Sequence, residues 1–115
     1  MHLPYIEEAF VPEPKLSGYL LAIDHAFGRS KALFLSSLGF RMGHPDVLRR
    51  ALLQHAADNA VSSVQSTPFG VKYLIEGRFS GPTGTSAVIR SVWFVETGER
   101  SPRFVTAYPI RGTQK

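Results

Sequence analysis

The sequence contains no cysteine, so disulfides, thiolate catalysis and cysteine-ligated zinc sites are excluded. It also has no run of about 18 apolar residues, and we expect no membrane-spanning segment. The histidines His2, His25, His44 and His55 lack the spacing of a metal-binding helix, so we expect no metal ion and no other cofactor. The first residues are acidic and broken by proline rather than basic and then apolar, so we expect no secretory signal and a cytoplasmic site of action.

The composition is that of an ordinary folded domain. The chain has 115 residues, of which 43% are hydrophobic and 19% charged, which is enough for one modest core. The formal net charge is +4, and this basic balance favours polyanionic partners without requiring them. We predict one domain over residues 1–115, made of an extended arm (1–13), a helical part (14–58), an antiparallel sheet (59–110) and a tail (111–115).

Helical signals fill the first half of the chain. Pro14 can start a short helix that reaches residues 19–22, and a second helix is predicted over 30–38, where Gly39 ends it. The clearest helix begins at Pro45. Its apolar positions recur on one face and include His55, which we interpret as a core or boundary residue; they are Val47, Leu48, Ala51, Leu52 and His55.

The second half of the chain alternates apolar and polar residues with the period of a strand. Turn residues separate the candidate strands, which cover 60–65, 71–79, 86–96 and 103–110. Short connections between neighbouring strands favour an antiparallel meander. The sequence therefore predicts an α+β fold, in which two or three N-terminal helices pack on one face of a four-stranded antiparallel sheet.

The alternation also separates the two faces of the predicted sheet. The face expected against the helices carries Val71, Tyr73, Ile75, Ala87, Ile89, Trp93 and Val95. The opposite face carries Lys72, Leu74, Glu76, Arg78, Val88, Arg90, Val92, Phe94, Phe104, Thr106 and Tyr108. Because this second face mixes aromatic, hydroxyl and cationic groups, it is more typical of a binding surface than of a core.

Basic residues gather at the start of the second predicted helix. A helix N-terminus carries partial positive charge, so cations there are unfavourable unless an anion answers them. His25 is a candidate general acid or base, and Lys31 is a candidate stabiliser of developing negative charge. Arg29 and Lys15 are candidate substrate-binding residues. The alternative is structural: His25 braces the helix start, and Asp24 is the counterion of Lys31.

The strands supply further candidates. Arg90 interrupts an apolar strand and must reach solvent, a carboxylate or a ligand. A pair with Glu76 on the neighbouring strand is the structural explanation. Thr106 and Tyr108 alternate onto one face, where hydroxyls beside a cation can hold a phosphate, although both residue types also simply favour strands. Lys72 is a further candidate substrate-binding residue.

Several short motifs carry a family resemblance. The chain contains Lys-Leu-x-x-Tyr-x-Leu, Asp-His-x-x-Gly-x-x-Lys-Ala, Leu-Gly-Phe and Thr-Ala-Tyr-Pro at residues 15–21, 24–32, 38–40 and 106–109. In these motifs, and over nearly its whole length, it resembles a small family of uncharacterised bacterial domains. Similar segments occur at the C-terminal ends of large secreted bacterial toxins, so the resemblance implies a toxin-type domain.

The predicted architecture resembles that of ribonuclease toxins such as barnase and RelE, although the paired Glu and His of barnase are missing. The resemblance implies metal-independent RNA cleavage by general acid–base chemistry, with the candidate catalytic residues His25, Lys31, Arg90, Thr106 and Tyr108. It also implies RNA as a partner and a small acidic antitoxin or immunity protein. The alternatives are a non-enzymatic module that binds an acidic protein or small anion, and an enzyme acting on a small-molecule phosphate.

Overall fold

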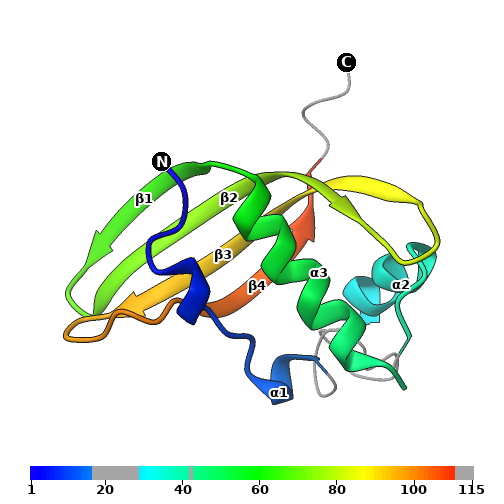
Figure 1. The fold of residues 1–115 in the computed structure, drawn as a ribbon, viewed down its shortest axis with the longest axis horizontal. Helices are drawn as coiled ribbons and strands as arrows, with labels where there is room; N and C mark the ends of the chain where they lie inside the picture. The colour runs from blue at the N-terminus through cyan, green and yellow to red at the C-terminus, as the bar shows by residue number, and fades with distance from the viewer. Residues whose placement is uncertain (17–28, 42, 111–115) are drawn as a thin grey trace.

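The structure is a computed structural model that describes residues 1–16, 29–41 and 43–110, with the backbone alone at 29–32. The helical elements are η1 (Ile6–Glu8), α1 (Glu13–Lys15), α2 (Arg29–Ser37) and α3 (Pro45–Asp58), and the strands are β1 (Val61–Thr67), β2 (Gly70–Ser80), β3 (Ser86–Glu96) and β4 (Arg103–Pro109). Figure 1 shows α3 lying across one face of the sheet. The predicted α+β fold is therefore confirmed. No helix in these described ranges is long and apolar enough to cross a membrane.

The strands form one antiparallel sheet in the order β1-β2-β3-β4. This is the predicted meander, in which each strand pairs with the next one along the chain. β3 spans the predicted residues, and the other strands differ from their predicted bounds by only one or two residues at their ends. The register places Glu76 opposite Arg90 and Arg90 opposite Tyr108, which brings residues distant in sequence onto one line across the sheet.

The helices begin and end at the residues that their chemistry favours. Pro45 lies in the first turn of α3, where its missing N–H costs nothing. After α2, Gly39 adopts a φ of 100°. There the Phe40 N–H donates to the Leu35 carbonyl at 3.1 Å and the Gly39 N–H to the Ser36 carbonyl at 2.9 Å, the pair of bonds that closes a helix through a left-handed glycine. The predicted helix starting near residue 14 is described only as α1, because 17–28 lie outside the described residues.

The hydrophobic core lies between the sheet and the helices. As predicted, it contains Leu48, Leu52, Ile89 and Trp93 together. Trp93 packs edge-on against Phe104, with ring centroids 5.4 Å apart. Both rings are fully buried, so this pair anchors β3 and β4 against the helical side.

A short chain of polar contacts runs through this core. The indole N–H of Trp93 donates to Ser91 Oγ at 2.9 Å, and Ser91 Oγ lies 3.1 Å from Nδ1 of His55. His55 is 2% exposed and Ser91 is fully buried, so of the two predicted positions, core or boundary, His55 occupies the core. Burial lowers the pKa of His55 because an imidazolium would lose its hydration there.

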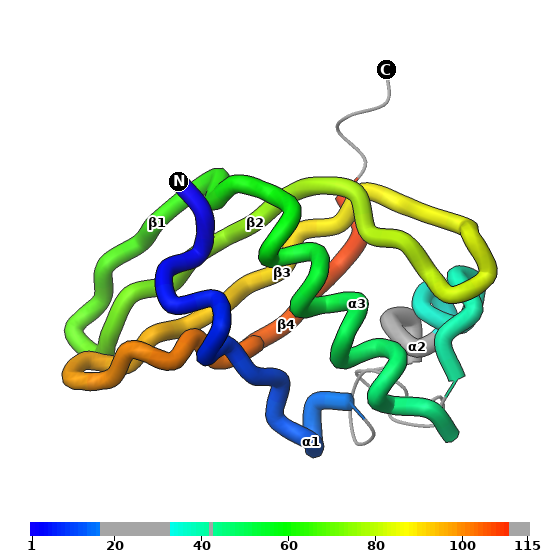
Figure 2. The backbone as a smooth tube through the Cα atoms, viewed as in Figure 1, coloured from blue at the N-terminus to red at the C-terminus, as the bar shows by residue number. Residues whose placement is uncertain are grey.

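The N-terminal arm corrects one expectation. It was predicted to be an extended arm outside the helices and the sheet, but Leu3 and Val11 are buried in the core. The Phe10 N–H donates to the Pro102 carbonyl and the Phe104 N–H to the Phe10 carbonyl, each at 3.0 Å. Figure 2 shows the arm crossing the sheet on the same side as α3. The arm therefore completes the core and covers the start of the edge strand β4.

The prediction that Phe104 shares a face with Thr106 is wrong. Val92 pairs with Thr106 whereas the next residue, Trp93, pairs with Phe104, so Val105 is an extra residue in β4. Such a β-bulge shifts the alternation of one strand by one residue. Phe104 consequently faces the core, and Thr106 keeps the side predicted for it.

Candidate outer-face site

The face of the sheet turned away from α3 is called the outer face. Its side chains are Lys72, Leu74, Glu76 and Arg78 on β2, Val88, Arg90, Val92, Phe94 and Glu96 on β3, and Arg103, Thr106 and Tyr108 on β4. Cross-strand pairing arranges them in rows, because residues directly opposite each other on one face are close neighbours. Cations outnumber carboxylates in this set.

One row contains Glu76, Arg90 and Tyr108. Arg90 Nε donates to Glu76 Oε2 at 2.7 Å, and Nη2 of the same guanidinium forms an ion pair with that carboxylate. Arg90 Nη1 donates to the Tyr108 hydroxyl at 3.3 Å, and the guanidinium lies 5.7 Å from the centre of the Tyr108 ring. The pair of Glu76 with Arg90 that the sequence predicted is therefore present, and Tyr108 joins it.

The contacts of Arg90 fix the position of its guanidinium and favour its charged form. The Tyr108 hydroxyl and the Glu76 carboxylate together raise the pKa of the guanidinium above its usual value. A guanidinium carries five N–H donors, so it can contact both neighbours and still donate to a further oxygen anion. Thr106 lies in the adjacent row opposite Val92. The structure thus brings Arg90, Thr106 and Tyr108 onto one patch.

Another row runs across Lys72, Phe94 and Arg103. Phe94 pairs with Lys72 on β2 and with Arg103 on β4. The Arg103 guanidinium lies 5.7 Å from the centre of the Phe94 ring, and Arg103 Nη2 is 3.5 Å from Glu96 Oε2. The row therefore places an aromatic ring between two cations.

The helix-start candidates are only partly located. His25 lies outside the described residues, so its role stays a prediction. The backbone of Arg29 and Lys31 forms the first turn of α2, as predicted for Lys31. Farther along the same helix, Phe34 lines a small cavity together with Tyr108, which places α2 beside the end of β4.

Lys15 is separated from the outer face. It is the last residue of α1, and the neighbouring Glu13 accepts a hydrogen bond of 3.1 Å from Arg49 of α3. This contact places α1 on the helical side of the molecule, as Figure 1 shows. Lys15 is therefore not among the side chains that gather around Arg90.

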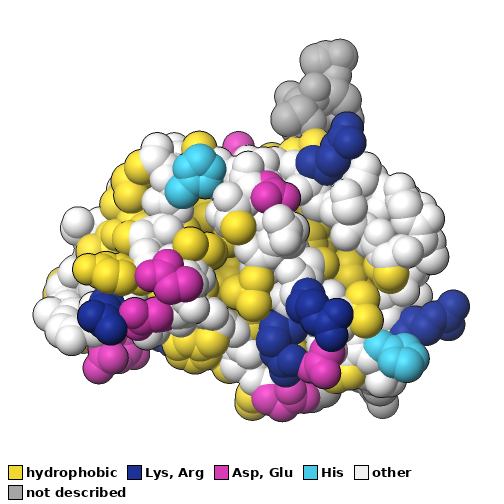
Figure 3. Space-filling view, viewed as in Figure 1, with side chains coloured by type: hydrophobic (Ala, Val, Ile, Leu, Met, Phe, Trp, Pro, Cys, Tyr) yellow, Lys and Arg dark blue, Asp and Glu magenta, His cyan; other side chains and the backbone are white. Residues whose placement is uncertain are grey.

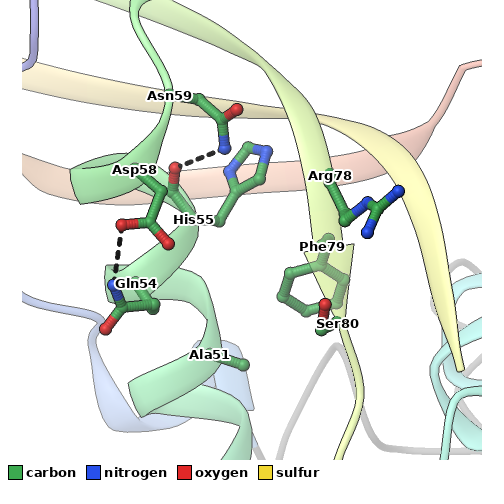
Figure 4. A pocket seen from close by; sticks show the side chains of 8 residues that line it. All are labelled: Ala51, Gln54, His55, Asp58, Asn59, Arg78, Phe79 and Ser80. Atoms are coloured by element: carbon green, nitrogen blue, oxygen red, sulfur yellow. Dashed lines mark hydrogen bonds between the residues drawn. The ribbon is translucent and has the colours of Figure 1, made fainter. Parts of the chain in front are cut away.

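A larger pocket of about 340 Å³ lies between α3 and β2 (Figure 4). Gln54 donates to Asp58 at 2.8 Å, and Asn59 donates to the backbone carbonyl of His55 at 2.9 Å. A side chain at Gly77 would meet Asn59 Oδ1 at 2.0 Å, so this glycine leaves room for the amide. The polar groups of the pocket thus close the end of α3, and the outer face remains the stronger candidate site.

The helical side carries charges of both signs. Figure 3 shows basic and acidic side chains lying next to each other there. Arg49 pairs with Glu13 and with Asp46, and Arg100 pairs with Glu8 at 3.0 Å. Within residues 1–16, 29–41 and 43–110 no group of three or more His, Asp or Glu side chains could hold a metal ion.

Sequence reasoning placed Phe94 on the correct face but missed its partner Arg103. The predicted alternation assigned Phe104 to that face, which left Arg103 on the other side. Only the extra residue Val105 brings Arg103 opposite Phe94. No residue type in this strand marks the extra residue, because Val105 followed by Thr106 fits a regular strand equally well.

Comparisons with known proteins agree with this architecture. One chain of a solved structure described as "Contact-dependent growth inhibition toxin - immunity protein complex from Klebsiella pneumoniae 342" is similar, with 27% sequence identity and a TM-score of 0.66. The match covers 93% of this chain and 97% of that chain. The sequence matches none of the curated proteins compared with it. The model of the family "Domain of unknown function (DUF6883)" matches residues 2–111, and the chain therefore belongs to that family.

Proposed function

We propose that this domain is a metal-independent ribonuclease toxin that acts on RNA in the cytoplasm. The observation that carries the proposal is the row of Glu76, Arg90 and Tyr108, with Thr106 beside it, on a surface rich in cations. The likeness to a chain from a toxin–immunity complex supports a role in such a system. The resemblance of the sequence motifs to segments at the ends of large secreted bacterial toxins also supports a toxin role.

The proposed chemistry needs few groups. His25 takes the proton of the ribose 2′-hydroxyl, whose oxygen attacks the adjacent phosphorus while the bond to the 5′-oxygen breaks. Arg90 and Lys31 stabilise the negative charge that develops on the phosphoryl oxygens. Thr106 and Tyr108 orient the phosphate, and Tyr108 donates a proton to the leaving oxygen.

The proposed partner is a small acidic immunity protein. An active ribonuclease would harm the cell that makes it, so a neutralising protein must cover the site. Since cations outnumber carboxylates on the outer face, an acidic surface would be complementary to it. The known complex of the structural neighbour supports this pairing of roles.

Inducible expression in a bacterial host tests the proposal. The wild type should arrest growth and produce discrete RNA fragments on a gel. Arg90→Ala and Tyr108→Phe should abolish both effects while the melting temperature stays within a few degrees. His25→Ala should abolish toxicity and leave RNA binding nearly intact, whereas Lys31→Ala should weaken RNA binding about tenfold. Arg50→Ala is the matched control, because Arg50 is an exposed arginine on α3.

A second candidate function is a binding module without enzymatic activity. The observation in its favour is that Arg90 is already held by Glu76, as a structural brace would be. A module would cause no RNA fragmentation, and it would bind an acidic protein or small anion with or without Tyr108. Growth arrest with intact RNA would instead favour an enzyme that acts on a small-molecule phosphate.

A further inference from the structure

The row of Lys72, Phe94 and Arg103 lies at the opposite end of the outer face from Tyr108. Phe94 is four residues from Arg90 along β3, which corresponds to about 13 Å at the usual rise per residue. All three side chains of the row are half-buried. They are thus held by the sheet and still reach its surface.

The surroundings of Phe94 keep its ring at the surface. A side chain at Gly70 would lie 2.8 Å from Cζ of Phe94, so the glycine provides space for the end of the ring. Arg103 lies over the ring and is anchored to Glu96. A rigid aromatic ring on a sheet, with cations on both sides, is the arrangement that binds single-stranded nucleic acid.

The chemistry of the neighbouring cavity favours a base over a phosphate. Phe10, Phe94, Glu96, Glu99 and Arg103 line this cavity, together with Ser101. Two carboxylates would repel a phosphate group placed inside this cavity, so the phosphates of a bound strand would lie outside it. The carboxylates can, however, accept hydrogen bonds from the N–H groups of a nucleobase.

We propose that Phe94 is the stacking platform for an unpaired base of the RNA, with Lys72 and Arg103 contacting the phosphates on its two sides. The proposal rests on the proposed function, because it assigns a binding subsite to the same RNA substrate. The outer face would then have two subsites: RNA cleavage occurs beside Arg90, and the RNA strand is bound at Phe94.

The test uses a single-stranded RNA whose 2′-hydroxyls are methylated, so that it binds without being cleaved. One base is replaced by 2-aminopurine, whose fluorescence falls when it stacks on an aromatic ring, and its position is scanned along the strand. Wild type should quench strongly at one position. Phe94→Ala should remove that quenching and weaken binding about tenfold or more. Phe94→Tyr should retain both, and Phe69→Ala, at an exposed aromatic in the β1–β2 turn, should change neither.

Binding by Phe94→Ala within about twofold of wild type, with quenching unchanged, would overturn the subsite. The proposed function would then still stand if wild type cleaves unmodified RNA. If wild type neither binds nor cleaves RNA, the proposed function itself fails and the subsite fails with it. Should Phe94→Ala fold poorly, Phe94→Leu keeps an apolar side chain of similar size without the ring, and the same loss of quenching is expected.

Discussion

Removal of one oxygen from the core should destabilise the fold strongly. Ser91 Oγ accepts a hydrogen bond from the Trp93 indole and contacts Nδ1 of His55, and all three side chains are buried. In Ser91→Ala both neighbours lose their partner at a site that water does not reach. Each orphaned buried group costs about 1–3 kcal/mol, so for two groups the free energy of unfolding should fall by about 2–6 kcal/mol.

Urea unfolding measures this loss directly. Trp93 is the only tryptophan in the sequence, so its emission reports on the core without labelling. With a denaturant dependence of about 2 kcal/mol per molar, the midpoint should move down by about 1–3 M. Ser86→Ala, at the exposed start of the same strand, should stay within about 0.5 kcal/mol. A Ser91→Ala protein as stable as Ser86→Ala would refute the reasoning.

Three further predictions concern acid, glycine and metal. Because the pKa of His55 is lowered in the folded state, the unfolded chain binds more protons below about pH 6.5. The melting temperature should therefore fall as the pH is lowered from about 7.5 to 5.5, and it should fall much less in His55→Phe. An equal fall in melting temperature in both proteins would contradict this. Gly39→Ala should cost about 1–3 kcal/mol in urea unfolding, because φ is 100° and the new Cβ would lie 2.8 Å from a Thr83 methyl. Gly43→Ala should be nearly neutral, because no atom of the described residues lies within 4 Å of its added Cβ; similar losses in the two variants would contradict this. RNA cleavage should survive EDTA, and loss with recovery on adding zinc would show that a metal is required.

Much of the fold could be predicted from the sequence because local patterns determine it. The stripe of α3 and the period-two strands each appear within a short window, and short turns leave little choice of topology. The N-terminal arm could not be predicted in this way. Its burial depends on Leu3 and Val11 reaching a core built by residues far along the chain.

The candidate site was predictable only where the register was simple. Glu76 and Arg90 lie on adjacent strands joined by a short turn, so counting outward from the turn pairs them. The partner of Phe94 depends on the β3–β4 register, which an extra residue changes. A valine followed by a threonine fits a regular strand as well as a bulge, so no residue type marks the shift.

The extra residue in β4 decides which side chains of this strand lie in the core and which lie on the outer face. On one side of Val105 the strand sends Phe104 inward, and on the other it sends Thr106 and Tyr108 outward. A substitution leaves the number of residues in the strand unchanged, whereas a deletion changes it. Deleting the single codon for Val105 would force a choice between Phe104 in the core and Tyr108 beside Arg90. The length of this strand is therefore constrained as well as its amino-acid sequence.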